Sequence, residues 1–161
     1  MSSSRRDVLL TWTLETRKYS VYIWVVITSN RKGQIAVSKA EVRAIELGFN
    51  PCIPVMDCRY DLVLDDGEKL WRVQVKSTDH KPSHSTGAVT AQLTYETRQR
   101  RRVVRYNKDE VDALVVYIPK IDRLCWFLPE MFAGKSALTI RIEPSKNRQQ
   151  SRIILASDYF W

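Results

Sequence analysis

The chain has 161 residues, with 26 Lys plus Arg against 18 Asp plus Glu and a net charge of +8. This length predicts one compact domain, and no apolar run reaches the roughly 18 residues of a membrane-spanning helix, which excludes a transmembrane protein. The excess of positive charge favours a polyanionic partner, with nucleic acid ahead of an anionic membrane.

The cysteine content points to a reducing compartment. Cys52, Cys58 and Cys125 are an odd number of cysteines without CxxC spacing, so a disulfide framework is not expected. Arg5 and Arg6 precede only a short apolar segment that charged residues interrupt, which does not match a secretory signal peptide. We therefore expect an intracellular protein.

In chain order, the first predicted elements are a strand and a helix. The segment from Val21 to Ile27 is apolar on both faces, which predicts a strand covered on two sides or buried at a subunit contact. Apolar residues recur at helical spacing from Gly33 to Leu47, and Gly48 supplies a stop, which predicts a helix. The apolar positions of this helix are Val37, Ala40, Ala44, Ile45 and Leu47.

The rest of the chain has the pattern of strands. Residues 60–65 and 69–77 alternate with period two around Asp66-Gly67, which predicts a hairpin with a two-residue turn. A helix followed by a run of strands predicts a mixed α/β sheet backed by few helices. The further predicted strands are residues 88–93, 112–119, 123–128, 138–142 and 153–155.

One face of the predicted hairpin gathers groups that suit phosphodiester hydrolysis. If the loop holds an even number of residues, Asp61 lies opposite or diagonal to Gln74, with Lys76 on the same face. A hard Mg²⁺ ion held by oxygen ligands neutralises the charge that develops on phosphorus. Asp61 is the natural ligand, and the Gln74 side-chain oxygen and the Val75 carbonyl can complete the protein ligands. Lys76 can orient the attacking water or help to deprotonate it.

Glu41 is the candidate for a second carboxylate. It lies four residues after Val37, among the apolar positions of the predicted helix. A carboxylate that faces a core is costly unless a cation or hydrogen bonds satisfy it, which favours a metal site there. Pairing of Glu41 with Arg43 or Arg72 at the edge of the polar face is the open alternative.

Other candidates also have plainer explanations. Asp61 and Lys76 could form a cross-strand ion pair on a solvated face. Asp65 and Asp66 are expected to be turn residues rather than metal ligands.

Five arginines between residues 97 and 105 form a basic cluster. The net charge of the chain favours phosphate contacts for them, and a solvated helix face or tail is the alternative. The predicted DNA-binding residues are Arg98, Arg100, Arg101, Arg102 and Arg105.

The spacing of the hairpin residues resembles a known nuclease motif. Tyr60-Asp61, followed after the hairpin by Gln74-Val75-Lys76, is similar to the core of the PD-(D/E)XK nucleases, in a variant with glutamine in place of the second acid. Over residues 31–160 the chain resembles the group I intron-associated homing endonucleases of this fold. The segments that carry this resemblance are Lys32–Val37, Glu46–Phe49, Arg59–Val63, Trp71–Lys76, Tyr106–Asp112, Tyr117–Pro119, Leu138–Ile142 and Ala156–Tyr159.

The resemblance implies a restriction-endonuclease-like PD-(D/E)XK core in residues 31–161, a mixed β-sheet flanked by helices. It leaves residues 1–30 as an N-terminal tail and one or more strands of unclear role. It also implies a Mg²⁺-dependent endonuclease that cuts a long, specific double-stranded DNA target as a homo-oligomer, a dimer or tetramer, without a membrane. The expected location is the cytoplasm or nucleoid of a prokaryote, or an organelle.

Asp61, Gln74 and Lys76 match the family motif residue by residue. The helical acid of the family often lies nearer the helix start, where this chain has Val37. Glu41 is therefore a candidate second acid whose position departs from the family pattern. Two alternatives stay open: a junction-resolving or repair nuclease on the same core, and a DNA-binding module without catalysis. The second arises because a neutral amide binds a metal less tightly than a carboxylate does.

Overall fold

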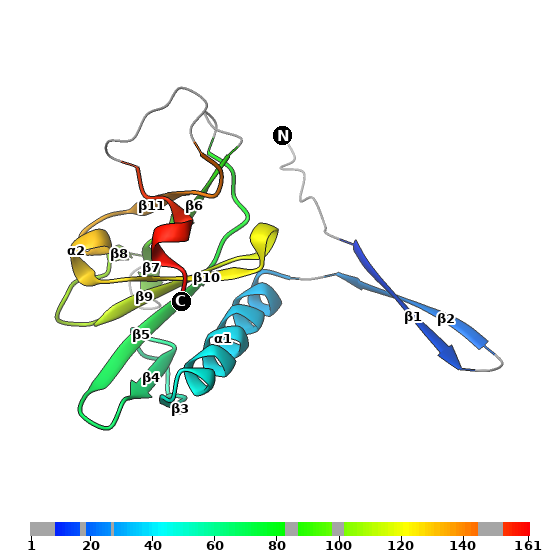
Figure 1. Cartoon of the computed structure of the whole chain (residues 1–161), viewed down its shortest axis with the longest axis horizontal. Coiled ribbons are helices and arrows are strands. Elements are labelled where there is room, and N and C mark those ends of the chain that lie inside the picture. Colours follow the sequence, from blue (N-terminus) through cyan, green and yellow to red (C-terminus); the bar gives the residue numbers. More distant parts are fainter. Residues whose placement is uncertain (1–8, 17–18, 27, 83–86, 98–101, 145–152) are drawn as a thin grey trace.

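The computed structural model describes residues 9–16, 19–26, 28–82, 87–97, 102–144 and 153–161 (Figure 1). The predicted mixed α/β architecture is confirmed. The strands are β1 (Leu9–Thr16), β2 (Tyr19–Val26), β3 (Asn50–Cys52), β4 (Leu62–Asp65), β5 (Leu70–Ser77), β6 (Ala88–Gln92), β7 (Thr94–Thr97), β8 (Arg102–Arg105), β9 (Ala113–Ile118), β10 (Arg123–Phe127) and β11 (Ala137–Arg141). The helices are α1 (Ser29–Glu46), α2 (Pro129–Phe132) and the 3₁₀ turns η1 (Pro119–Ile121) and η2 (Ala156–Tyr159).

A five-stranded mixed sheet forms the centre of the molecule. Its strand order is β10-β9-β5-β4-β3, in which β5 and β9 are parallel and the other pairs are antiparallel. Side chains alternate between the two faces of a strand. Val73 and Val75 of β5 therefore face one side of the sheet, and Gln74 and Lys76 face the other.

The helix α1 begins earlier than the spacing of apolar residues predicts. It starts at Ser29 rather than Gly33, because the Thr28 side chain caps it by accepting a hydrogen bond from the Arg31 N–H at 3.4 Å. It ends at Glu46, one residue before the predicted end at Leu47, and Gly48 has a φ of +88°, a left-handed conformation that favours glycine.

The buried face of α1 is narrower than expected. Ala36, Ala40 and Ala44, at i, i+4 and i+8, are fully buried. Two of the other apolar positions that predicted the helix, Ile45 and Leu47, are not buried, because these residues are 57% and 44% exposed. Small residues on the buried stripe let α1 lie close to the sheet, which turns these larger side chains outward.

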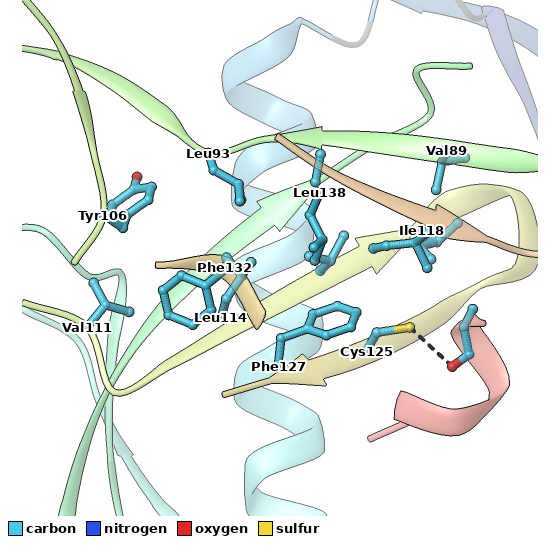
Figure 2. Packing of buried hydrophobic residues seen from close by; sticks show 14 residues of the cluster. Val89, Leu93, Tyr106, Val111, Leu114, Ile118, Cys125, Phe127, Phe132 and Leu138 are labelled. Atoms are coloured by element: carbon cyan, nitrogen blue, oxygen red, sulfur yellow. Dashed lines mark hydrogen bonds between the residues drawn. The ribbon is translucent and has the colours of Figure 1, made fainter. Parts of the chain in front are cut away.

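Two hydrophobic clusters cover opposite faces of the sheet. The first joins the alanines of α1 to residues that include Leu62, Val73 and Val75. The second joins β9 and β10 to β6, β11 and α2, and it contains Phe127 and Phe132. Figure 2 shows this second cluster, with α1 beyond the sheet on the far side. The side chains of Gln74 and Lys76 thus belong to the side of the second cluster.

The N-terminal part differs from the prediction. The expected strand at residues 21–27 is β2, which pairs in antiparallel register with β1, a strand that the sequence interpretation missed. In Figure 1 this hairpin extends away from the rest of the chain.

The C-terminal segment also differs. Residues 153–155 do not form the predicted strand, and Leu155 makes only an isolated bridge to Arg141. Within the described residues, no helix is long and apolar enough to cross a membrane.

Candidate active site

The β4–β5 hairpin sets the register of the site. Leu62 pairs with Val73 and Asp65 pairs with Leu70, so the loop holds the four residues 66–69 rather than the predicted two. Both lengths are even, and the predicted shared face is therefore preserved. The Asp66 carboxylate accepts the Glu68 and Lys69 N–H groups at 2.9 and 2.7 Å, which confirms its role as a turn residue.

Asp61 enters β4 directly beside the middle of β5. Its N–H donates to the Val73 carbonyl at 2.9 Å, and its Oδ2 accepts the Val75 N–H at 2.8 Å. The Gln74 side-chain nitrogen donates both to this Oδ2 and, at 3.1 Å, to the Val75 carbonyl oxygen. The carboxylate, the amide and the carbonyl that the sequence selected as metal ligands thus converge on one point.

The site is withdrawn from water. Gln74 is only 7% exposed, and Asp61 and Lys76 are half-buried. Burial raises the pKa of Asp61 above its ordinary value, against the opposing effects of the Val75 N–H, Lys76 and Gln74. Burial lowers the pKa of Lys76, and the negative charge of Asp61 opposes this. Asp61 and Lys76 therefore influence each other electrostatically on a partly buried face of the sheet.

Tyr106 is a neighbour of the site that the sequence interpretation did not select. The Lys76 ammonium lies 5.2 Å from the centroid of the buried Tyr106 ring, in cation–π geometry. Tyr106 opens one of the segments that resemble the homing endonucleases, and this was the available signal. Tyr106 belongs to the second cluster, on the side of the sheet that Gln74 and Lys76 face.

Arg72, on the same face of β5 as Gln74, is fully engaged elsewhere. Its Nε and Nη2 donate to the two oxygens of Asp112 at 2.9 and 3.1 Å, and this pair lowers the pKa of Asp112. Its Nη1 donates to the Asp109 carbonyl. Arg72 therefore anchors the segment before β9 to β5.

Glu41 lies on α1, half-buried, in the layer that covers the opposite face of the sheet from Gln74. It is not among the groups that shift the pKa of Asp61. The two arginines considered as partners of Glu41 form ion pairs with other carboxylates: Arg43 with Glu46 at 2.9 Å, and Arg72 with Asp112. Its role as a second acid remains a prediction.

Few carboxylates are available as metal ligands in the candidate site. No group of three or more His, Cys, Asp or Glu side chains gathers within the described ranges in a way that could hold a metal. The candidate site therefore offers one carboxylate, one amide and one carbonyl.

Only part of the arginine cluster lies in the described chain. Arg98, Arg100 and Arg101 lie outside the described residues, and Arg102 opens β8, the partner of β7. Arg105 is exposed, and its Nη1 donates to the Gly134 carbonyl at 3.2 Å. Residues 102–105 form a strand rather than the alternative helix face or tail.

A groove of about 700 Å³ lies away from this site, between α1 and the C-terminal segment. Val42, Leu124, Phe160 and Trp161 are among its lining residues. Because α1 covers the opposite face of the sheet from Gln74, the groove is not part of the candidate site.

Comparison with known proteins identifies the family of the chain. The family model of the PD-(D/E)XK endonucleases matches residues 27–161, and the chain belongs to this family. The fold and the family together define a nuclease. A structural search matches the chain to a bacterial homing endonuclease, I-Ssp6803I, at 27% identity and a TM-score of 0.66, over 83% of this chain and 88% of that one. MepB matches at 14% identity and a TM-score of 0.40, over 71% and 85% of the respective chains. No curated protein matches the chain.

Proposed function

We propose that this protein is a Mg²⁺-dependent endonuclease that hydrolyses phosphodiester bonds at a long, specific double-stranded DNA target. One observation carries this proposal: the Asp61 carboxylate and the Val75 carbonyl oxygen converge on the Gln74 amide, beside the half-buried Lys76. Family membership supports the reaction class. The similarity to I-Ssp6803I, which is described as a homing endonuclease, supports the kind of target.

The oxygen atoms of the site fit a hard cation. Asp61 Oδ2 and the Val75 oxygen both accept a hydrogen bond from the same Gln74 nitrogen, so the two oxygens face one point. A flip of the Gln74 amide would turn Oε1 towards that point as a third oxygen ligand, and Mg²⁺ prefers such a set. Bound there, the ion would neutralise charge on the phosphate during hydrolysis. Glu41 remains a predicted fourth contributor.

Lys76 contributes a proton site next to these ligands. Its lowered pKa enlarges the neutral fraction of the amine, which can take a proton from the attacking water. In its charged form the same group offsets the negative charge of the phosphate. Tyr106 fixes the position of the ammonium by its ring contact.

Removal of divalent metal tests the proposal. We expect cleavage of plasmids with random genomic inserts in Mg²⁺, and none after EDTA treatment, with activity restored when Mg²⁺ is added back. The hard-oxygen ligands are the reason, and gel electrophoresis is the measurement. Retained DNA binding without cleavage in any divalent ion would instead leave a non-catalytic DNA-binding module.

The arginine cluster is proposed to contact DNA phosphates. Changing Arg100, Arg101 and Arg102 together to glutamine should flatten the plot of log affinity against log salt by about 0.9 per lost phosphate contact. Fluorescence anisotropy over a range of salt concentrations measures the slope. The same number of changes at Lys32, Lys39 and Lys120, which are engaged in ion pairs, provides the control. An unchanged slope in the arginine variant would place the DNA surface elsewhere.

We also propose a homo-oligomer, a dimer or tetramer, assembled through the N-terminal hairpin. The strands β1 and β2 pair only with each other within the described chain, and an isolated two-stranded hairpin is marginally stable in water. One site per copy cuts one strand, so copies would supply the second site. Light scattering should give a mass of at least two chains at micromolar concentration, and deletion of residues 1–26 should reduce it to one. A monomeric full-length chain would refute the assembly.

A further inference from the structure

The loop between β3 and β4 exposes apolar side chains to an unusual degree. The side chains of Ile53, Val55 and Met56 are 59%, 97% and 79% exposed. Pro54 fixes one φ angle within this run and stiffens it. Single exposed apolar residues are ordinary on a surface, but three in four consecutive positions form a protruding apolar tip.

The loop leaves the sheet at the end where the candidate site lies. Cys52 at the end of β3 pairs with Val63, and β4 begins one residue before, at Leu62, immediately after Asp61. Met56 precedes Asp61 by five residues, so the two lie within about 17 Å even if the chain between them were fully extended. That distance corresponds to about five base-pair steps of 3.4 Å.

The segment that joins the tip to Asp61 is held in place. The Arg59 side chain lies 3.7 Å from Glu110 Oε1, which ties the end of the loop to the segment anchored by Arg72. The Cys58 thiol lies 3.4 Å from the Tyr60 carbonyl, in hydrogen-bonding position. These contacts hold the segment between the apolar tip and Asp61 against the rest of the chain.

We propose that Val55 and Met56 form a wedge that inserts between base pairs of the bound duplex, a few steps from the cleaved phosphate, and unstacks them. This inference rests on the proposed nuclease function, which requires a duplex to lie across Asp61. A duplex placed there comes within reach of the tip. Apolar side chains make no favourable contacts with phosphates. They interact favourably when they insert between stacked bases, as in proteins that kink DNA through the minor groove.

The charge of the chain favours DNA as the partner of this tip. The net charge of +8 attracts a polyanion, and an apolar tip on a basic chain can reach the bases once the phosphates are bound. Exposed apolar residues of α1, such as Val42 and Ile45, belong to the helix that covers the opposite face of the sheet from Gln74 and Lys76. They offer a matched control.

The test uses a duplex selected from random-sequence DNA by binding to the full chain in Ca²⁺, with 2-aminopurine placed at successive positions. On binding, the wild type should raise 2-aminopurine fluorescence at one or two adjacent positions, the sign of an unstacked base. The V55S/M56S variant should lose most of that increase and bind more weakly. The V42S/I45S variant should keep it, with unchanged affinity.

Three results would overturn the wedge: an equal increase in V55S/M56S, no increase with the wild type, or a smaller oligomer of V55S/M56S by light scattering with unstacking unchanged. The last would make the tip a subunit contact. The proposed function fails separately, because cleavage is not needed for this readout. If the wild type unstacks bases but never cuts DNA in Mg²⁺, the proposed nuclease function is refuted and the wedge is supported. If it cuts DNA without unstacking bases, the wedge is refuted and the nuclease function is supported.

Discussion

Replacing Lys76 with methionine should lower the single-turnover rate of DNA cleavage by about 10²–10⁴-fold, the usual contribution of a positioned proton-transfer group. Methionine retains length and polarizability, so the packing against Tyr106 is largely kept. DNA binding should change little, because one charge among 26 is lost. The Lys81→Met variant, at an exposed position, is the control and should cleave at the wild-type rate.

The pH dependence of the cleavage rate distinguishes a role of Lys76 in proton transfer from a role as a fixed positive charge. Because the pKa of Lys76 is lowered by burial, the wild-type rate should rise with pH and level off below the ordinary lysine pKa of about 10.4. The lysine ammonium is less stable in the folded state than in the unfolded one. The free energy of unfolding should therefore rise with pH between the lowered and the ordinary pKa, and Lys76→Met should remove this rise. A variant with wild-type rate and pH profile would exclude Lys76 from the chemistry.

Replacing Asp61 with asparagine should abolish cleavage, by about 10³-fold or more, and yet stabilise the fold. The loss follows from removal of the proposed carboxylate ligand, where a bound cation would contribute several kcal/mol. The stabilisation follows from the raised pKa of Asp61, which means that its carboxylate is disfavoured in the folded state. Thermal unfolding at neutral pH should show the higher midpoint in the variant.

Asp66 provides a comparison for the sign of the change in stability that Asp61→Asn should cause. The stability cost of Asp61 appears as pH rises from the ordinary carboxyl pKa through the raised one, so the wild type and Asp61→Asn should diverge over that interval. Asp66 has a lowered pKa, because Trp71 and the Lys69 and Glu68 N–H groups donate to it. Asp66→Asn should therefore destabilise the fold and leave cleavage intact. Equal effects of the two substitutions on stability would contradict the burial of Asp61.

The site was predictable from the sequence because a strand has period two. Asp61, Gln74 and Lys76 fall on one face for any even loop, so the error in turn length did not move them. Tyr106 was not predictable in this way, since no local period links a residue about 30 positions after Lys76 to that lysine.

The fold outside the hairpin shows the limits of local patterns. The apolar spacing in α1 identified the helix, but not that its alanines face the sheet and Ile45 faces water. That choice depends on how closely the helix approaches the strands. The start of α1 was missed because the Thr28 cap lies before the apolar periodicity begins.

Glu41 illustrates a limit of a different kind. Glu41 was predicted from its place among the apolar positions of the helix, and that pattern does not show which face of the sheet the helix covers. The sheet places α1 and the Gln74 side chain on opposite faces, which no spacing within the helix reveals. If Glu41 is nonetheless a ligand, Glu41→Gln should weaken Mg²⁺ activation of cleavage as Asp61→Asn does.

The most direct test of the central claim is single-turnover cleavage in Mg²⁺ by the wild type and Asp61→Asn, on one duplex that both bind equally in Ca²⁺. The wild type should cut the duplex, and Asp61→Asn should leave it intact at the same occupancy. Cleavage at equal rates by the two proteins would show that the site built from Asp61, Gln74 and Val75 is not where the phosphodiester bond is broken.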